Sequence, residues 1–239
     1  MDAYDAIQPV LRFDSFFAHN VLISHCTTCF CRFFILESSI HPSMWLAKRV
    51  QYTNSLAVGS IVGYIIGLGD RHANNVLIDN NTSELTHIDL GIAFDRGMLL
   101  PVPERVPFRL TRDLVDALGP FGTNGLFLGS CENSMRVLRL NRDALLGVFD
   151  VLLHDPLTDW SGTIRKVKGI QNVDSGSDVQ ACEEVSLEAE STLLGIKNKL
   201  SGIHCSEMLS VSAHVKVLCQ EAQDPERLAC IYHGWSPWL

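Results

Sequence analysis

Residues 67–78 read Gly-Leu-Gly-Asp-Arg-His-Ala-Asn-Asn-Val-Leu-Ile, and residues 87–91 read His-Ile-Asp-Leu-Gly. The apolar end of the first stretch predicts a short β-strand, and residues 85–88 predict its partner. The residues between them are polar and turn-forming, so the two strands are expected to form a hairpin. Because a hairpin returns the chain to its starting point, we expect Asp89 to lie beside Asn75.

These two stretches together hold two carboxylic acids, a histidine and an amide. Asp70 and Asn75 are five residues apart, and Asp89 follows in an Asp-x-Gly turn. In phosphoryl-transfer sites one carboxylate faces the attacking hydroxyl, while an amide and a second carboxylate hold metal on the phosphates. Mg²⁺ suits such a site because it prefers a few protein oxygens completed by phosphates. The alternative is a set of surface turn residues, but the joint pattern is more specific than any of its parts.

Composition sets the class of protein. The chain has 239 residues, of which 46% are hydrophobic, and its formal charge is −8. That is enough apolar sequence for one large domain or two small ones, and the acidic balance argues against a general nucleic-acid-binding surface. The acidic, polar residues 1–5 predict no signal peptide. Charged and histidine residues interrupt the apolar run 13–36, so no membrane span is expected.

Cysteines are numerous but scattered. The eight cysteines follow no regular spacing, which predicts reduced thiols in an intracellular protein. Residues 25–31 look like half of a zinc site, but no second pair of ligands with the usual spacing follows.

Helical patterns dominate the rest of the chain. Pro42 suits the first turn of a helix, and residues 56–66 are apolar nearly all round, which indicates a buried helix that ends at Gly67. Further helices are expected from Thr111 to Leu118, around Met135 and Leu138, and from Asp143 to His154. The predicted fold class is therefore mainly α with a small β-hairpin, and a helical layer lies behind the site.

The segment after Gly91 is predicted to be a long loop. Its three prolines, Pro101, Pro103 and Pro107, prevent regular structure. A kinase places its activation and substrate-reading segment next to the metal site in this way. The residues expected to contact a substrate or a partner are Glu104, Arg105, Phe108 and Arg109. The alternative for Arg109 is an ion pair with Asp113 or Asp116.

Two patterns divide the C-terminal third. Residues 162–190 are polar and acidic, which is typical of a linker that leads into a helix or of a solvated insertion. Residues 211–222 show the apolar spacing of an amphipathic helix, and Asp224-Pro225 starts a short one. Trp235 and Trp238 near the end are expected to pack on the core, on a partner or at a membrane surface.

The motif Gly69-Asp70-Arg71-His72-x-x-Asn75, followed by Asp89-Leu90-Gly91, resembles that of the phosphatidylinositol-3-kinase-related protein kinases. Ordinary protein kinases carry the order His-Arg-Asp, whereas this chain carries Asp-Arg-His. Residues 220–228, together with Gly234-Trp235-x-x-Trp238, resemble the FATC tail of this family. The lipid kinases of the wider superfamily lack such a tail. The resemblance covers about residues 32–160 and 207–239.

The resemblance implies a role for each matching residue. Asp70 would be the catalytic aspartate that accepts or orients the hydroxyl proton, and His72 would stabilise charge near the γ-phosphate of ATP. Asn75 and Asp89 would bind Mg²⁺, with Mn²⁺ possible. Leu77 and Ile88 are expected from the hairpin geometry to face the adenine as an apolar floor.

The resemblance also implies substrates and partners. Family substrates carry Ser-Gln or Thr-Gln, and the loop 87–111 resembles the part that reads the glutamine. Residues 48–53 and 103–113 are most similar to the members that act in DNA-damage signalling, which implies a nuclear protein. Damage-sensor and regulatory proteins are expected to bind through the tail, with Trp235 and Trp238 as contacts.

Four segments are expected. Residues 1–36 are a divergent N-terminal segment, and residues 37–160 are the large, C-terminal lobe of a PI3/PI4-kinase-like protein kinase fold, with catalytic loop 67–75 and activation loop 87–111. An acidic regulatory linker, 161–206, and a FATC domain, 207–239, complete the chain.

Two elements of a kinase small lobe are missing from the sequence. The first glycine is Gly59, so no Gly-rich loop precedes Asp70, and Lys48, the sole lysine before Asp70, lies in a predicted helix. We therefore expect a large lobe without its small lobe, which is inactive alone. Two alternatives remain: a non-catalytic binding or scaffold module acting through its tail, and a lipid kinase. The loop after Asp89 separates the latter, because inositol-lipid headgroups require a basic segment.

Overall fold

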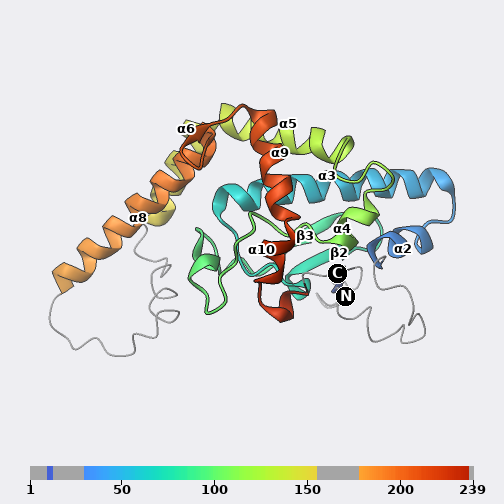
Figure 1. The fold of residues 1–239 in the computed structure, drawn as a ribbon, viewed down its shortest axis with the longest axis horizontal. Coiled ribbons are helices and arrows are strands. Elements are labelled where there is room, and N and C mark those ends of the chain that lie inside the picture. Colours follow the sequence, from blue (N-terminus) through green and yellow to red (C-terminus); the bar gives the residue numbers. More distant parts are fainter. Residues whose placement is uncertain (1–9, 13–29, 155–177, 237–239) are drawn as a thin grey trace, which may run out of the picture.

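The computed structural model describes residues 10–12, 30–154 and 178–236 (Figure 1). The predicted fold class is confirmed: helices dominate, and a small antiparallel sheet lies among them. The helices are α2 (Phe30–Glu37), α3 (Pro42–Ile66), α4 (Arg112–Ala117), α5 (Leu126–Leu140), α6 (Arg142–Leu153), α8 (Asp178–Ser201), α9 (Val211–Ala222) and α10 (Pro225–Ala229). The strands are β1 (Val10–Arg12), β2 (Val76–Asp79), β3 (Leu85–His87), β4 (Ile203–His204) and β5 (Glu207–Met208).

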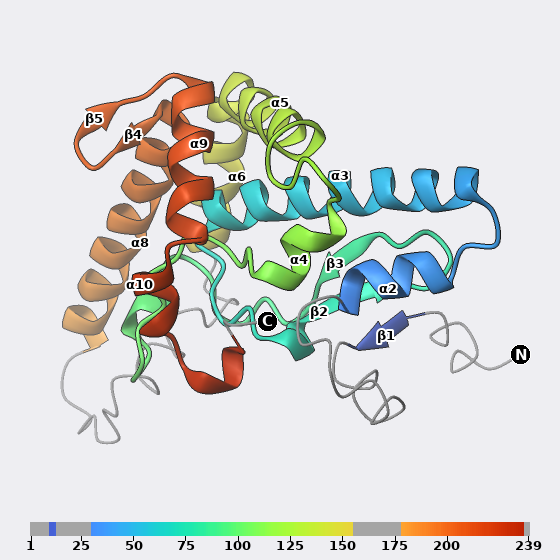
Figure 2. The ribbon, with the colours of Figure 1, turned by 45° about the vertical axis from the view of Figure 1, so that its right-hand side comes forward.

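Helix α3 is the long element against which the others pack. It contacts α2, α5, α8 and β3, and Figure 2 shows it running between the α5/α9 layer and the sheet. Tyr52, Leu56 and Ile61 on it are completely or almost completely buried, as expected for a helix that is apolar nearly all round. Among the described residues, no helix is long and apolar enough to cross a membrane.

The end of α3 depends on a glycine. Gly67 has φ 61°, and its N–H bonds back to the helix, so the chain leaves α3 in a left-handed turn. A Cβ at this position would lie 2.3 Å from the backbone nitrogen of Asp95. Only glycine therefore fits between the start of the catalytic loop and the loop that carries Asp95.

Substituting Gly67 by alanine is expected to lower the free energy of unfolding by about 1–3 kcal/mol, because the left-handed backbone and the contact with Asp95 both become strained. The matched control is Gly129→Ala on α5, where a Cβ meets nothing within 4 Å. That change is expected to raise the free energy of unfolding by about 0.5–1 kcal/mol. Urea unfolding followed by circular dichroism measures both, and equal effects of the two substitutions would refute the prediction.

The sheet has the order β1-β2-β3, with antiparallel neighbours. Val76 lies opposite His87 and Ile78 opposite Leu85, so β2 and β3 form the predicted hairpin. Asp79 closes the turn, since its Oδ1 accepts the backbone N–H groups of Asn81 and Thr82.

Lys48 is a structural residue. Its Nζ donates to the carbonyl oxygens of Ser38 and Asn80, both at 3.1 Å, so it joins the end of α2 to the hairpin turn. The side chain is buried on helix α3. This agrees with the expectation that Lys48 is not a strand lysine that holds ATP phosphates.

The segment expected to be divergent, residues 1–36, contributes two elements to the fold. Strand β1 adds to the free edge of β2, and α2 packs on α4 and α3. Cys31 and Ile35 on α2 are 1% exposed. The boundary at residue 36 therefore cuts through an element of the core rather than separating a segment from it, because α2 spans Phe30–Glu37.

The acidic segment 161–206 is helical over much of its length. Helix α8 occupies Asp178–Ser201, and Ala189, Ile196 and Leu200 on it are buried. Apolar residues at 189, 193, 196 and 200 recur at helical spacing among the charged ones, and this stripe packs against α3, α5 and α6. The segment 161–206 therefore contains the helix into which a linker was expected to lead, and residues 161–177 lie outside the described residues.

Helix α9 attaches the C-terminal segment to the core. Val215, Leu218 and Ala222 are fully buried, and α9 packs on α5. His214 is also completely buried, and the Nη2 of Arg139 donates to its Nδ1 at 2.7 Å. Because arginine has only donors, the proton of His214 lies on Nε2, 3.0 Å from the hydroxyl of Tyr64.

The pKa of His214 gives a pH-dependent stability. Burial, together with Arg139 and His204, lowers this pKa to about 4, while Glu221 opposes the change. In the unfolded chain the imidazole takes up a proton near pH 6.5, but in the folded chain it stays neutral until about pH 4. The contribution is thus fully present above pH 6.5 and is lost as the pH falls towards 4.

We therefore expect His214 to remove about 1–3 kcal/mol from the free energy of unfolding between pH 7 and pH 4. Urea unfolding at several pH values measures this, with His214→Gln as the comparison. The variant should show a flatter pH dependence over this range. If both proteins show the same pH dependence, the contribution of His214 is refuted.

Candidate active site

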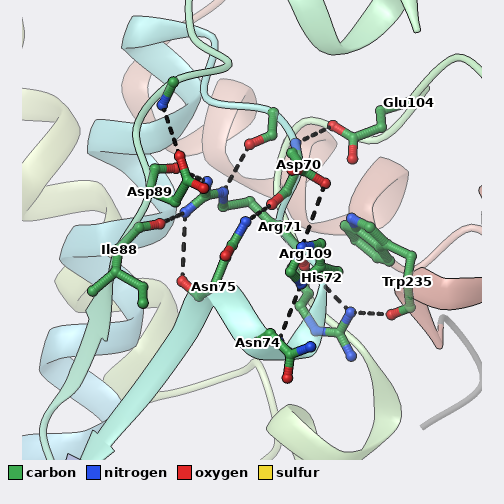
Figure 3. A network of polar contacts seen from close by, with 12 residues as sticks. Asp70, Arg71, His72, Asn74, Asn75, Ile88, Asp89, Glu104, Arg109 and Trp235 are labelled. Atoms are coloured by element: carbon green, nitrogen blue, oxygen red, sulfur yellow. Dashed lines mark hydrogen bonds and ion pairs between the residues drawn. The ribbon is translucent and has the colours of Figure 1, made fainter. Parts of the chain in front are cut away.

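The catalytic loop lies between the end of α3 and strand β2 (Figure 3). Asp70 has φ 55°, which is uncommon outside glycine. His72 caps the 3-10 turn Ala73–Asn75, since its Nδ1 accepts the N–H of Asn74 at 3.2 Å. The ring proton must then lie on Nε2, which is 3.9 Å from Asp70 Oδ1. The loop thus places the carboxylate of Asp70 and the imidazole N–H of His72 near one another.

The buried side chain of Arg71 connects the loop to the end of the hairpin. It is 3% exposed, and its guanidinium donates to the carbonyl oxygens of Gly69 at 2.8 Å, Ile88 at 2.7 Å and Asp89. Burial lowers its pKa, while Asp70, Glu104 and Asp89 oppose the change. One buried cation therefore joins the catalytic loop to the end of β3. No role was predicted for Arg71 from the sequence, although an arginine so close to two glycines is a signal for a buried side chain that bonds to backbone carbonyls.

The hairpin brings Asn75 and the Asp89 region together. The N–H of Ile88 donates to the Asn75 carbonyl at 3.0 Å, so the residue after β3 lies opposite the residue before β2, and Asp89 follows directly (Figure 3). Asn75 is buried, and its Nδ2 donates to the Asp70 carbonyl at 2.8 Å. The amide oxygen of Asn75 is then the atom suited to a metal. Asp89 is exposed, as a metal-binding carboxylate at a nucleotide site requires.

These donors fit a magnesium ion with phosphates. One carboxylate and one amide oxygen are the small protein contribution that Mg²⁺ accepts when phosphates and water complete its shell. In the described ranges, no three His, Cys, Asp or Glu side chains gather as an all-protein metal centre.

Leu77 and Ile88 share one face of the hairpin. Leu77 lies opposite Thr86, and Ile88 is two residues beyond Thr86, so alternation along the strands places them on the same side. Both are half-buried, whereas Val76 and Ile78 point into the core. This is compatible with an apolar floor under an adenine.

The four residues expected in the activation loop divide into two groups. Arg105 is exposed, and Glu104 is half-buried and accepts the N–H of Asp70 at 2.9 Å. Phe108 is 6% exposed in the hydrophobic core, and Arg109 is 3% exposed. The structure therefore does not offer Phe108 or Arg109 to a substrate. The prolines end before residue 108, and the chain enters the core ahead of α4.

Arg109 instead binds the C-terminal segment. Its Nη1 donates to the carbonyls of Trp235 and, at 3.4 Å, Arg71. The alternative for Arg109 was an ion pair with Asp113 or Asp116 of α4, but both of these acids have other partners. Asp113 accepts the N–H of Cys31 at 3.1 Å and its thiol at 2.9 Å. The other acid, Asp116, pairs with Arg32, whose Nη1 lies 3.6 Å from Asp116 Oδ1.

Trp235 is not presented to a partner. It is 2% exposed, with the guanidinium of Arg109 over its ring at 4.7 Å from the centroid. Of the three expected environments, the kinase core is the one it occupies, because this large apolar ring is covered by the residues of the catalytic region. Trp238 lies outside the described residues.

The fold and site define a kinase class. Residues 24–162 match the family Phosphatidylinositol 3- and 4-kinase, and residues 208–239 match the FATC domain. The chain belongs to the phosphatidylinositol 3- and 4-kinase family, as the motifs predicted.

Within that family its relatives are the ATM and Tel1 kinases. The chain is 42% identical over 214 residues to "Serine/threonine-protein kinase ATM" of Arabidopsis thaliana, covering 87% of this chain and 6% of the relative. It is 46% identical over 207 residues to "Serine/threonine-protein kinase TEL1" of Candida albicans, covering 87% of this chain and 7% of the relative. The chain thus spans less than a tenth of these relatives.

Solved structures show the same similarity. The structure described as "FAT and kinase domain of CtTel1" has a TM-score of 0.74 and 38% sequence identity, covering 89% of this chain and 14% of that one. A "Tel1 kinase butterfly symmetric dimer" has a TM-score of 0.72 and 39% identity. Together they support the large lobe of a kinase as the fold.

Proposed function

We propose that the chain forms the large lobe and tail of an ATM-type serine/threonine protein kinase. Such a kinase transfers the γ-phosphate of ATP to serine or threonine followed by glutamine, in nuclear DNA-damage signalling. The observation that carries the proposal is the bridge made by Arg71. Its hydrogen bonds join the loop with Asp70 and His72 to the strand end with Asp89, which supports a common role for these side chains.

Each residue has a role in the transfer. The carboxylate of Asp70 accepts or orients the proton of the substrate hydroxyl, and the Nε2–H of His72 stabilises charge that develops on the γ-phosphate. Asn75 and Asp89 would hold Mg²⁺, which neutralises phosphate charge when bound. Leu77 and Ile88 would carry the adenine, and Arg105 remains available to the substrate peptide.

The 239 residues alone are expected to transfer phosphate at a negligible rate. The sequence before Asp70 offers no Gly-rich loop, and Lys48 is committed to Ser38 and Asn80. Positioning of the γ-phosphate is therefore incomplete. The test is transfer from ATP-Mg to a Ser-Gln peptide by the purified chain. Robust turnover that Asp70→Ala abolishes would refute this incompleteness.

A chimera tests the kinase proposal itself. In it, residues 30–239 replace the matching segment of the Candida albicans Tel1 relative, so that the rest of a kinase is present. We expect this chimera to phosphorylate the Ser-Gln peptide. A chimera that folds and binds ATP but transfers no phosphate would contradict the proposal.

The second candidate is a non-catalytic module that binds regulatory proteins through the tail. The burial of Trp235 counts against this candidate for that residue, whereas Tyr232 in the same tail is exposed and accessible to a partner. A pull-down with the intact chain and with one ending at Ser206 separates the two. Binding lost on truncation, with no nucleotide affinity, would favour the module.

A lipid kinase is the least supported candidate. Inositol-lipid phosphates require several accessible basic side chains. In the loop after Asp89, Arg96 and Arg109 are buried and Arg105 is exposed, while the acid Asp95 is paired with Lys199 at 2.7 Å. This loop offers too little accessible positive charge for a lipid headgroup.

A further inference from the structure

The backbone of Asp70 is held from both sides. Its left-handed conformation is one that a non-glycine residue keeps only where the surroundings enforce it. Its carbonyl accepts the Nδ2 of Asn75 at 2.8 Å, and its N–H donates to Oε2 of Glu104 at 2.9 Å. Glu104 therefore helps to set the direction in which the side chain of Asp70 points.

Two glycines seat the carboxylate of Glu104. A Cβ on Gly69 would lie 2.9 Å from Oε2 of Glu104, and a Cβ on Gly97 would lie 2.6 Å from it. The N–H of Glu104 also donates to the Gly97 carbonyl at 3.0 Å. This carboxylate thus fits a slot between two backbones that no larger residue would leave open, and it does not project outwards to read a substrate.

The indole of Trp235 lies beside the same carboxylate. Figure 3 shows the ring nitrogen of Trp235 on the side of Glu104 and Asp70. The Nε1–H is buried and has no hydrogen-bond partner among the described residues. Burial raises the pKa of Glu104, and the Asp70 N–H and the Trp235 indole oppose that rise. The buried indole N–H of Trp235 and the half-buried carboxylate of Glu104 therefore lie near one another, between the tail and the loop.

Arg109 makes the second connection. Its Nη1 donates both to the Trp235 carbonyl and to the Arg71 carbonyl, and its guanidinium lies over the indole. The residue next to the catalytic aspartate and the tail residue thus share one buried cation, although 126 residues separate Arg109 from Trp235.

We propose that Glu104 and Arg109 are positioning residues through which Trp235 of the tail holds Asp70 and Arg71 in their working conformation. The importance of this conformation rests on the proposed function, because it assumes that Asp70 is the catalytic aspartate. The contacts themselves do not depend on that assumption. The tail is then a built-in part of the catalytic loop rather than an appendage to it.

Hydrogen exchange of the full 239-residue chain tests the proposal. Glu104→Ala is expected to raise the exchange rate of the peptide 68–76 about tenfold, the effect of losing one such hydrogen bond. Glu104→Gln keeps an oxygen acceptor and should restore most of the protection, which a general packing defect would not allow. Trp235→Phe and Arg109→Lys should raise exchange in the same peptide, while exchange of α3 stays unchanged. The control Trp45→Phe should leave the peptide unaffected.

A spectroscopic signature makes the test specific. In a ¹H–¹⁵N spectrum the indole signal of Trp235 should shift in Glu104→Gln, whereas that of Trp45 should not. If peptide 68–76 exchanges at the wild-type rate in Trp235→Phe and Arg109→Lys, or if the Trp235 signal does not move, the proposal is overturned and the kinase proposal stands. A chimera that stays active when Asp70 is replaced would refute the kinase proposal. It would not change the hydrogen-exchange and spectroscopic results expected here.

Discussion

Replacing Asp70 by asparagine is expected to lower kcat for phosphate transfer by about 10²–10⁴-fold, the usual contribution of a positioned acid or base. The experiment uses the Tel1 chimera, in which a complete kinase surrounds this chain. Asparagine has nearly the same shape, so it should keep the backbone bonds to Glu104 and Asn75. What it removes is the negative charge that orients or accepts the hydroxyl proton. The KM for ATP should change little, because Asp70 is not among the groups that hold the nucleotide.

Asp143→Asn is the matched control. Asp143 lies at the start of α6, its side chain is 87% exposed, and it pairs only weakly with its neighbour Arg142. This variant should keep the activity of the chimera within a factor of two, roughly the range of neutral surface substitutions. A chimera whose kcat survives Asp70→Asn within a factor of ten would show that Asp70 neither accepts nor orients the hydroxyl proton.

Arg71→Leu is expected to lower the free energy of unfolding by about 3–5 kcal/mol, a loss typical of breaking a buried ionic network. The substitution leaves the buried carbonyl of Gly69 and the partly buried carbonyls of Ile88 and Asp89 without this donor. Each unpaired buried carbonyl costs about 1–3 kcal/mol. Relief from burying a cation offsets part of this, but it does not supply three donors. Because domains have only about 5–15 kcal/mol in total, the variant should be close to unfolding at 37 °C.

Urea unfolding measures this loss, and two further variants make it interpretable. Arg71→Lys should recover only part of the stability, since an ammonium cannot span three carbonyls as a planar guanidinium does. Arg136→Leu is the control on α5, where the exposed guanidinium bonds only to Asn133 of the same helix. A loss for Arg71→Leu no larger than that for Arg136→Leu would contradict the bridging role.

Most of the local structure of the candidate site could be predicted from short stretches of the sequence. The hairpin was predictable because a polar turn separates two short apolar runs, and its register then places Asn75 opposite Ile88. Helix α3 was predictable from Pro42, an apolar stretch and Gly67. In each case the signal lies within the same continuous stretch of sequence as the element that it predicts. Whether Asp70, His72, Asn75 and Asp89 perform the chemistry assigned to them is still a prediction.

Contacts between distant segments were not predictable in this way. Phe108 and Arg109 stand in a proline-rich loop and look accessible, but their partners belong to the core and to a tail 126 residues away. Glu104 similarly binds a backbone N–H that is 34 residues earlier. The packing of helix α8 was not predictable, because acidic residues separate its few apolar positions. The helices against which these positions pack are distant in the sequence.

Strand β1 gives the small sheet a protective function. It occupies the edge of β2 that would otherwise expose unpaired N–H and C=O groups, and exposed strand edges recruit strands of other molecules. On the opposite side, α3 packs against β3. Strand β1 then forms the outer edge itself, but it is only three residues long, and a very short edge strand offers little for another chain to pair with.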